Sequence, residues 1–251
     1  MSVLRSRDNP RVKRWARLVA DARFRRSERR IIVEGPHLLD AALAQGWKVV
    51  ELLATEASEL TAKAGRAPVL VSESVLKSIV DSETPQGVAA ELELRQAPSL
   101  PAGDTVFLEG VQDAGNVGAL LRSAAAFGIR AAVLDSACAD AWSAKTLRAG
   151  AGAHFLLQVS QVPRLPAALG TFRGRLLCTV AHGGIALNEA NLSGAIGWIF
   201  GNEGQGVSAE LQAKASLQVR VPTGKGTESL NVAAAAAICF YEKFNRPGAG
   251  S

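Results

Sequence analysis

The sequence contains few cysteines, few histidines and no long apolar run, and each shortage excludes a class of protein. Cys138, Cys178 and Cys239 lie far apart and form no Cys-x-x-Cys pair, which predicts neither a disulfide framework nor a zinc site. We expect these three cysteines to be small, reduced side chains in the core of a cytoplasmic protein. No run reaches the roughly 18–20 apolar residues that cross a bilayer, and none follows the first methionine as in a secretory signal. We therefore expect a cytoplasmic protein with no membrane partner and no metal.

Positive charge is concentrated at one end of the chain. Residues 1–30 contain eleven lysines and arginines against three acids, a net charge of +8, whereas the whole chain of 251 residues carries +5. A basic block on a mildly acidic body is typical of a protein that binds a polyanion. Ten of the eleven are arginines, which can grip phosphate through two hydrogen bonds, and Trp15 and Phe24 stand among them. A solvated helix face is the alternative, and a membrane surface is disfavoured because the segment lacks a broad apolar face.

The stretch Arg95–Gly103 contains two prolines and a glycine and is the best candidate for a linker. It divides a small α/β domain of residues 1–97 from a second α/β domain of residues 104–251. In the second domain, short apolar strands alternate with helices, which predicts a parallel sheet covered on both faces. Strands are expected at 30–34, 49–54, 69–71, 87–94, 105–111, 131–134, 155–159, 176–180, 195–200 and 217–221. Helices are expected at 10–22, 36–45, 58–64, 72–80, 117–127, 143–149, 165–171, 209–215 and 230–244.

Three loops follow predicted strands, and ligands in open parallel sheets bind beyond the carboxyl ends of the strands. The first loop carries Asn116, placed to cap the helix that follows, with Arg122 six residues later, nearly two turns along. The second loop, Gly201–Gly206, and the third, Val221–Asn231, are rich in glycine. They lack the spacing of the dinucleotide fingerprint and of a Walker phosphate-binding loop. A single glycine-rich loop is more often a tight turn than a ligand-binding loop, so only the three loops taken together indicate a function.

In their order and spacing, the three loops resemble those of the SpoU/TrmH family of RNA 2′-O-ribose methyltransferases, within the SPOUT class. The resemblance covers the chain from about Thr105 to Glu242, and its most specific element is Glu228-Ser-Leu-Asn-Val232 before a helix of small residues. The chain departs from the family at Thr223, where methionine is common, which affects the expected shape of one cofactor wall. The segments 9–13, 33–35 and 84–87 and the arginine-rich stretch to residue 30 resemble the RNA substrate-binding domain that many members carry.

This resemblance implies a deep trefoil knot in the C-terminal α/β domain and a homodimer whose two protomers line one site. It implies S-adenosyl-L-methionine as the cofactor, held in the knot mainly by backbone, with glycines that allow close approach. The implied cofactor-binding residues are Gly201, Asn202, Glu203, Gly204, Val221, Pro222 and Leu230. The implied catalytic residues are Arg122, Asn116, Glu203, Ser229 and Asn231, and the residues expected to bind RNA are Arg11, Lys13, Arg25, Arg26, Arg29 and Arg30.

A ribose 2′-hydroxyl is a poor nucleophile, so methyl transfer to it needs a group that takes its proton or stabilises the developing charge. Arg122 is the first candidate, as a ligand for phosphate and negative charge, because a guanidinium does not lose its proton in proteins. Glu203 is expected to orient Arg122 or to accept the proton. His37, His154 and His182 stand in no motif and are expected to be structural or surface residues.

The expected function is 2′-O-methylation of large-subunit (23S) ribosomal RNA, with transfer RNA as the alternative substrate; this choice rests on family analogy. Two other functions stay open: an RNA-binding ribosome-assembly factor that keeps the fold without activity, and methylation of a base. The set Asn116, Arg122, Glu203 and Asn231 argues against the first, and the Asn116-to-Arg122 motif argues against the second.

Overall fold

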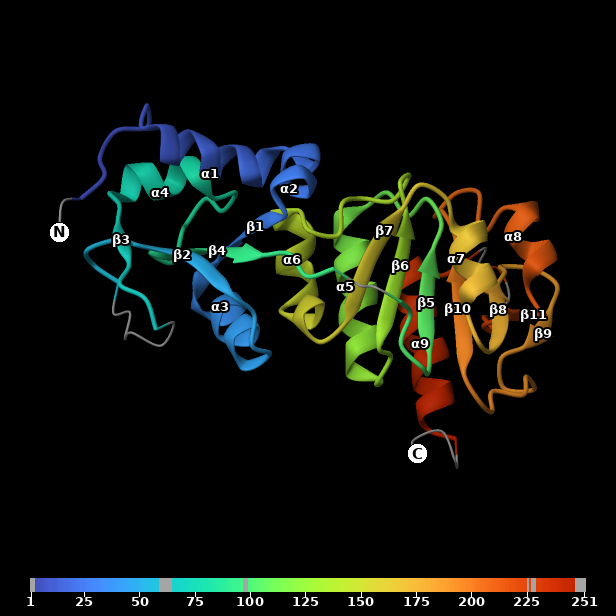
Figure 1. The fold of residues 1–251 in the computed structure, drawn as a ribbon. Helices are drawn as coiled ribbons and strands as arrows, with labels where there is room; N and C mark the ends of the chain where they lie inside the picture. Colours follow the sequence, from blue (N-terminus) through green and yellow to red (C-terminus); the bar gives the residue numbers. More distant parts are fainter. Residues whose placement is uncertain (1–2, 59–64, 97–98, 225, 227–228, 247–251) are drawn as a thin grey trace. The chain divides into compact units, whose positions relative to one another are not determined.

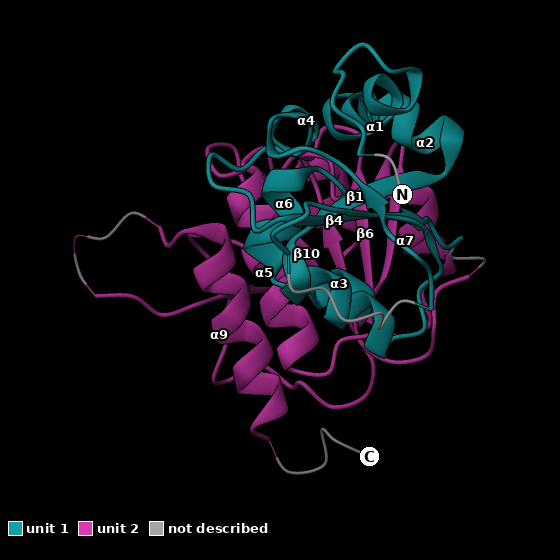
Figure 2. Cartoon of the chain, turned by 90° about the vertical axis from the view of Figure 1, so that its left-hand side faces the viewer, with its two compact units in different colours: residues 1–96, 142–155 teal, residues 97–141, 156–251 magenta. Residues whose placement is uncertain are grey.

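The computed structural model describes residues 3–58, 65–96, 99–224, 226 and 229–246, and the chain packs into two compact units. Residues 1–96 with 142–155 form the first unit, and residues 97–141 with 156–251 form the second (Figure 2). The sequence places one boundary between residues 97 and 104. In the structure the segment 142–155, which that boundary assigns to the second domain, packs instead with the first unit.

The first unit is a four-stranded mixed sheet between two layers of helices (Figure 1). The strands follow the order β1-β4-β2-β3, in which β4 pairs antiparallel with β1 and β2, and β3 pairs parallel with β2. Its elements are α1 (Pro10–Ala20), α2 (Ala22–Glu28), β1 (Arg30–Glu34), α3 (Gly35–Ala44), β2 (Val49–Ala54), β3 (Val69–Leu70), α4 (Glu73–Ile79), β4 (Val88–Glu93) and α6 (Ala144–Gly150).

Alternation along the strands divides the apolar side chains of this unit between two cores. Ile32 of β1 packs with α1 and α4, while its neighbours Ile31 and Val33 pack with α3 and α6. This is the two-residue period of a strand, whose successive side chains point to opposite faces. Asn9 caps α1 by accepting a hydrogen bond from the amide of Arg11, as the Asn-Pro pair predicts.

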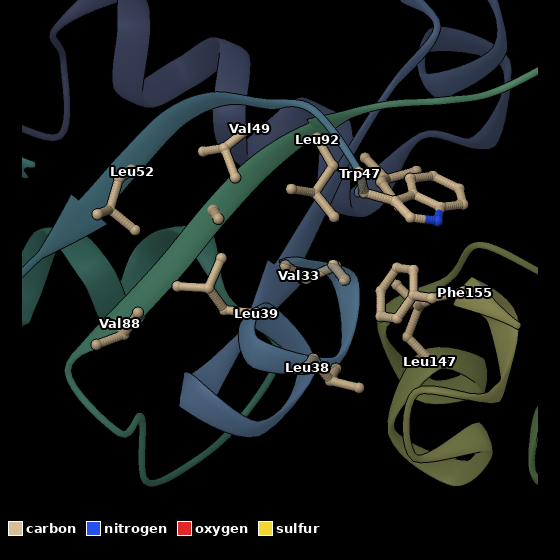
Figure 3. Close-up of a cluster of buried hydrophobic side chains, with 13 residues drawn as sticks. Val33, Leu38, Leu39, Trp47, Val49, Leu52, Val88, Leu92, Leu147 and Phe155 are labelled. Carbon is tan, nitrogen blue, oxygen red and sulfur yellow. The ribbon is translucent and has the colours of Figure 1, made fainter. Parts of the chain in front are cut away.

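The segment 142–155 is part of the second of these cores. Leu147 of α6 and Phe155 lie beside Trp47 and the α3 side chains (Figure 3). The rings of Trp47 and Phe155 meet edge to face, with centroids 5.2 Å apart. Leu147 is 1% exposed and Phe155 is 5% exposed. Leu147 and Phe155 therefore depend on the first unit for their burial, although they follow the predicted linker in the chain.

The second unit is a seven-stranded sheet in which every pairing is parallel, which confirms the predicted architecture. The strand order is β7-β6-β5-β10-β8-β11-β9. Its elements are β5 (Thr105–Leu108), α5 (Ala114–Ala126), β6 (Ala131–Asp135), β7 (Gln158–Val162), α7 (Leu165–Thr171), β8 (Arg175–Thr179), β9 (Ile185–Ala186), β10 (Ile196–Phe200), α8 (Ala209–Lys214), β11 (Leu217–Arg220) and α9 (Val232–Phe244).

The central strand β10 is buried along its whole length and packs against helices on both faces. Ile199 points toward α7 and α8, in a cluster with Leu169 and Leu211. Trp198 and Phe200 point the other way and meet Phe240 of α9, with ring centroids 6.1 and 5.6 Å apart. The fully apolar run predicted such a doubly covered strand, and its end delivers Gly201 directly to the second loop.

Several predictions about individual elements need correction. The segment predicted to be one strand from Phe155 to Val159 begins with a 3-10 turn, Ala153–Phe155, and β7 starts at Gln158. The helix α2 and the short strand β9 were not predicted. The helix predicted at 58–64 lies almost entirely outside the described residues. The trefoil knot stays a prediction of the resemblance. No helix among the described residues is long and apolar enough to span a membrane.

Candidate functional site

The three loops singled out in the sequence leave the carboxyl ends of β5, β10 and β11. In the sheet order β5 lies beside β10, and this is where the chain order of neighbouring strands breaks. Open parallel sheets bind ligands at such a break, because the loops on either side diverge and leave a crevice. The arrangement of the strands thus brings loops that lie about a hundred residues apart to one edge of the sheet.

The second loop is a tight backbone turn. The amide of Asn202 donates to the carbonyl oxygen of Gly206 at 3.1 Å, and the amide of Gly206 donates back at 2.8 Å. Inside the turn, Asn202 Oδ1 accepts hydrogen bonds from the amides of Gly204 and Gln205. A Cβ atom at Gly201 would stand 2.2 Å from the carbonyl carbon of Gly206, closer than real Cβ atoms approach backbone. Only glycine fits at position 201.

Hydrogen bonds tie the first loop to the second. Asn202 Nδ2 donates to the carbonyl oxygen of Gly110 at 2.9 Å, and the amide of Gly110 donates to Asp135 Oδ1 at 3.1 Å. Helix α5 begins at Ala114, and Asp113 caps it by accepting from the amide of Asn116 at 2.8 Å. The prediction that Asn116 caps this helix was therefore wrong. Because Asp113 takes that role, the side chain of Asn116 is available for other contacts.

A chain of side-chain hydrogen bonds joins all three loops. Asn116 Nδ2 donates to Glu203 Oε1 at 3.0 Å, and Asn231 Nδ2 donates to Asn116 Oδ1 at 2.9 Å. Asn231 Oδ1 in turn accepts from the amides of Ala233 and Ala234, so Asn231 is the N-cap of α9. These contacts fix which way each amide group points and hold one oxygen of the Glu203 carboxylate. The structure thus brings together three of the five predicted catalytic residues.

A cavity of about 520 Å³ opens beside this chain of hydrogen bonds. That volume lies in the range of small-molecule sites. Six of the seven predicted cofactor-binding residues line it, namely Gly201, Asn202, Glu203, Gly204, Val221 and Leu230. Pro222 is exposed and is not among the lining residues, whereas the predicted catalytic Ser229 is.

Some lining residues were not expected from the sequence. His182, set aside as a structural or surface residue, lines the cavity from the loop after β8, and so does Gln218 of β11. No motif surrounds either, so the sequence alone offered no signal for them; their strands had to be placed in the sheet first. By contrast, His154 is fully buried in the first unit, beside the ring of Trp142.

Arg122 stands apart from this cavity. It is exposed on α5 and does not line the cavity wall, so within one chain the structure does not bring it to Glu203. Glu228, the first residue of the most specific sequence element, lies outside the described residues, as do Lys225 and Thr227. Within the described residues no group of histidine, cysteine, aspartate and glutamate side chains is arranged to hold a metal ion.

The residues expected to bind RNA sit in the first unit in two different states. Arg25 is 4% exposed and donates to backbone carbonyls, and Arg11 and Lys13 are paired with carboxylates. Arg26 and Arg29 are exposed, and Arg30 is half-buried near Glu91 and Glu93. The basic block is therefore not one uniform surface.

Similarity to known proteins extends over both halves of the chain. Residues 104–241 match the SpoU rRNA Methylase family, and residues 9–90 match the MRM3-like substrate binding domain. The 23S rRNA (guanosine(2553)-2′-O)-methyltransferase RlmP of Bacillus subtilis strain 168 is 33% identical over 246 residues, which cover 96% of this chain and 98% of that protein.

Solved structures with the same fold cover nearly the whole chain. An AdoMet-bound rRNA methyltransferase from Sinorhizobium meliloti superimposes with a TM-score of 0.84 at 28% identity, over 96% of each chain. A structure described as an RNA 2′-O ribose methyltransferase superimposes with a TM-score of 0.78 at 29% identity, over 96% of this chain and 97% of that one.

Proposed function

The chain belongs to the SpoU rRNA Methylase family, and from this premise we propose that it transfers a methyl group from S-adenosyl-L-methionine to a ribose 2′-hydroxyl of 23S ribosomal RNA. The observation that carries the proposal is the hydrogen-bonded set Glu203, Asn116 and Asn231 beside a glycine-walled cavity. A 23S ribosomal RNA substrate, which the Bacillus subtilis relative is named for, would place the enzyme in the cytoplasm.

The cavity suits S-adenosyl-L-methionine in size and in the character of its wall. Glycines at 201 and 204 expose backbone to the cavity, and Val221 and Leu230 add apolar surface. Such a wall can hold an adenosine by backbone hydrogen bonds and close packing. When bound there, the cofactor supplies an electrophilic methyl group on a sulfonium. The chain itself must then orient the ribose and manage the hydroxyl proton.

Glu203 is the residue of this chain best placed to receive that proton. Its Oε1 is held by Asn116, and among the described residues no hydrogen bond engages Oε2. A carboxylate on a cavity wall, with one oxygen fixed and no partner for the other among the described residues, can accept a proton from a hydroxyl. Asn116 and Asn231 act as positioning residues, because each holds the next side chain in one orientation. Ser229 is a further polar group on the same wall.

We propose that a homodimer accounts for the position of Arg122. The outer face of α9 exposes Ile238, Tyr241 and Phe244, at 40%, 53% and 58%. Phe127, at the end of α5, packs against the last two of these rings, with centroids 5.9 and 5.8 Å away. A contiguous apolar patch of this kind marks a protein interface. We propose that two copies pair through this face and that exposed Arg122 of α5 serves the partner's cavity.

In that role Arg122 binds an RNA phosphate and stabilises negative charge as the 2′-oxygen attacks. A guanidinium fits this work because it stays charged and presents a planar fork of donors. An arginine supplied by the second copy would also make activity depend on dimer formation. The active site and the dimer are then one proposal, because Arg122 of each protomer completes the cavity of the other.

The experiment is methylation of purified 23S ribosomal RNA and of bulk transfer RNA with labelled cofactor, followed by digestion to nucleosides and mass spectrometry. The proposal expects a 2′-O-methylated nucleoside from the 23S RNA alone. A base-methylated nucleoside, or labelling of transfer RNA only, would contradict it. RNA binding without any methylation would indicate an assembly factor. A Glu203→Gln variant is the matched control, because it keeps the shape of the side chain and removes the acceptor charge.

A further inference from the structure

The cations of α1 are neutralised by acidic side chains of the same unit. Arg11 Nη2 lies 2.5 Å from Glu51 Oε1, and Lys13 Nζ lies 2.8 Å from Asp8 Oδ1. Arg14 donates to both carboxylate oxygens of the fully buried Glu91, at 2.8 and 2.9 Å. A phosphate that approaches α1 meets each of these positive charges together with a negative one. Its net attraction to this helix is therefore small.

Arg25 of α2 serves the fold. Its Nη1 donates to the carbonyl oxygens of Leu18 and Val19, at 2.7 and 2.6 Å. These carbonyls belong to the last turn of α1, where helical oxygens have no partner within the helix and the helix dipole is negative. Arg25 thus caps α1 and joins it to α2. At 4% exposure it cannot reach RNA without unfolding this junction.

The other arginines of α2 face solvent. Arg23 and Arg26 are three residues apart, so they lie on neighbouring turns of the helix, and both are exposed, unlike Arg25. Among the described residues, neither guanidinium forms a hydrogen bond or an ion pair. Arg29 follows as the left-handed C-cap residue, with φ of 54°, and is also exposed. Its guanidinium donates to the carbonyl oxygen of Leu94 at 3.3 Å. Among the described residues it forms no direct ion pair, although its charge helps to lower the pKa of Glu93.

We infer that Arg23, Arg26 and Arg29 form the surface of the first unit that binds RNA phosphates, and that the cations of α1 do not. The inference rests on the proposed function and names the part of the basic block that meets the substrate. Among the residues that the structure describes, none of the three guanidiniums forms an ion pair with a carboxylate, so each offers bidentate donors without the breaking of such a pair. The exposed face carries Ser27 beside the arginines and no large apolar side chain, which fits a phosphate backbone better than a lipid surface.

The test compares two variants that remove the same charge from neighbouring helices. Arg23→Gln/Arg26→Gln and Arg11→Gln/Lys13→Gln each lose two positive charges. Binding of the full-length proteins to a 23S ribosomal RNA transcript is measured from 50 to 200 mM salt. Each lost phosphate contact should reduce the log–log salt slope by about 0.7–0.9, so the α2 variant should lose roughly 1.4–1.8. From 50 to 200 mM salt, the factor by which the affinity of the α2 variant falls should therefore be about ten times smaller than the factor for the wild type.

The α1 variant should keep the wild-type slope to within about 0.5, less than one contact. The inference is overturned if the α1 variant loses the larger slope, if both variants lose equal slopes, or if the α2 variant keeps the wild-type slope. Thermal unfolding of the same proteins, followed by circular dichroism, checks that both remain folded. A wild-type protein that neither binds nor methylates the transcript would contradict the proposed function itself, which separates the two failures.

Discussion

The sharpest structural constraint on the cofactor cavity is the lack of room for a side chain at Gly201. The Cβ of an alanine there would lie 2.2 Å from the carbonyl carbon and oxygen of Gly206 and 2.3 Å from the amide nitrogen of Val207. These are backbone atoms, so no rotamer change relieves the overlap. Restoring an ordinary contact requires the loop to open by roughly 1 Å, the gap between 2.2 Å and van der Waals distance.

Opening the loop by that amount breaks the paired hydrogen bonds between Asn202 and Gly206, at 2.8 and 3.1 Å. At about 0.5–1.5 kcal/mol for each bond, Gly201→Ala should cost roughly 1–3 kcal/mol of loop stability. The cofactor wall includes this loop, so affinity for S-adenosyl-L-methionine should fall about 5- to 150-fold. The sheet should survive, because the loop lies beyond the end of β10.

Isothermal titration calorimetry with S-adenosyl-L-methionine measures the affinity, and circular dichroism checks the fold. Gly224→Ala in the third loop is the matched control, because an added Cβ there meets no atom within 4 Å. Wild-type affinity in Gly201→Ala would refute the steric argument. An equal loss in Gly224→Ala would show that alanine is harmful in these loops for a reason other than contact with Gly206.

Three further predictions follow from the site, the dimer face and the core. Arg122→Ala and Arg122→Lys should each lower the rate of single-turnover methyl transfer on the order of a hundredfold or more, with little change in cofactor affinity. Mixing Arg122→Ala with Glu203→Gln protomers should restore part of the activity, because one site of each mixed dimer would have both wild-type side chains. No recovery would place Arg122 in its own protomer's site. Ile238→Asp/Tyr241→Asp should yield monomers by light scattering and lose activity together with the dimer, since charge cannot be buried in an apolar interface; active monomers would contradict the shared site. Burial raises the pKa of the Cys138 thiol to about 12, so at pH 8 only about one molecule in ten thousand carries the reactive thiolate. A thiol reagent should therefore modify Cys138 after unfolding but not in the native protein. A fast reaction of Cys138 in the native protein would contradict its burial.

Local patterns in the sequence predicted the parallel sheet and most of its helices because the relevant forces act over a few residues. The apolar run of β10 has no polar position, which only a doubly covered strand explains. Asn9-Pro10 specifies a helix start through one hydrogen bond and one fixed dihedral angle. The start of α5 was misplaced because Asp113 and Asn116 can both cap. The choice is made by the loop around Gly110, whose position depends on Asp135 from another strand.

Long-range pairing was beyond the reach of sequence reasoning. The partners of Arg11 and Arg14 are Glu51 and Glu91, which lie 40 and 77 residues along the chain. Charge counting therefore found a basic block but could not tell paired cations from free ones. The same limit applies to Leu147, whose apolar character predicts burial without saying that the first unit buries it.

The most direct test of the central claim is a map of ribose methylation in ribosomal and transfer RNA from cells with and without this gene. The account predicts that one 2′-O-methyl group disappears from 23S ribosomal RNA in the deletion strain. The wild-type gene should restore it, and the Glu203→Gln variant should not. An unchanged 23S map, a lost base methylation, or a loss confined to transfer RNA would contradict the account.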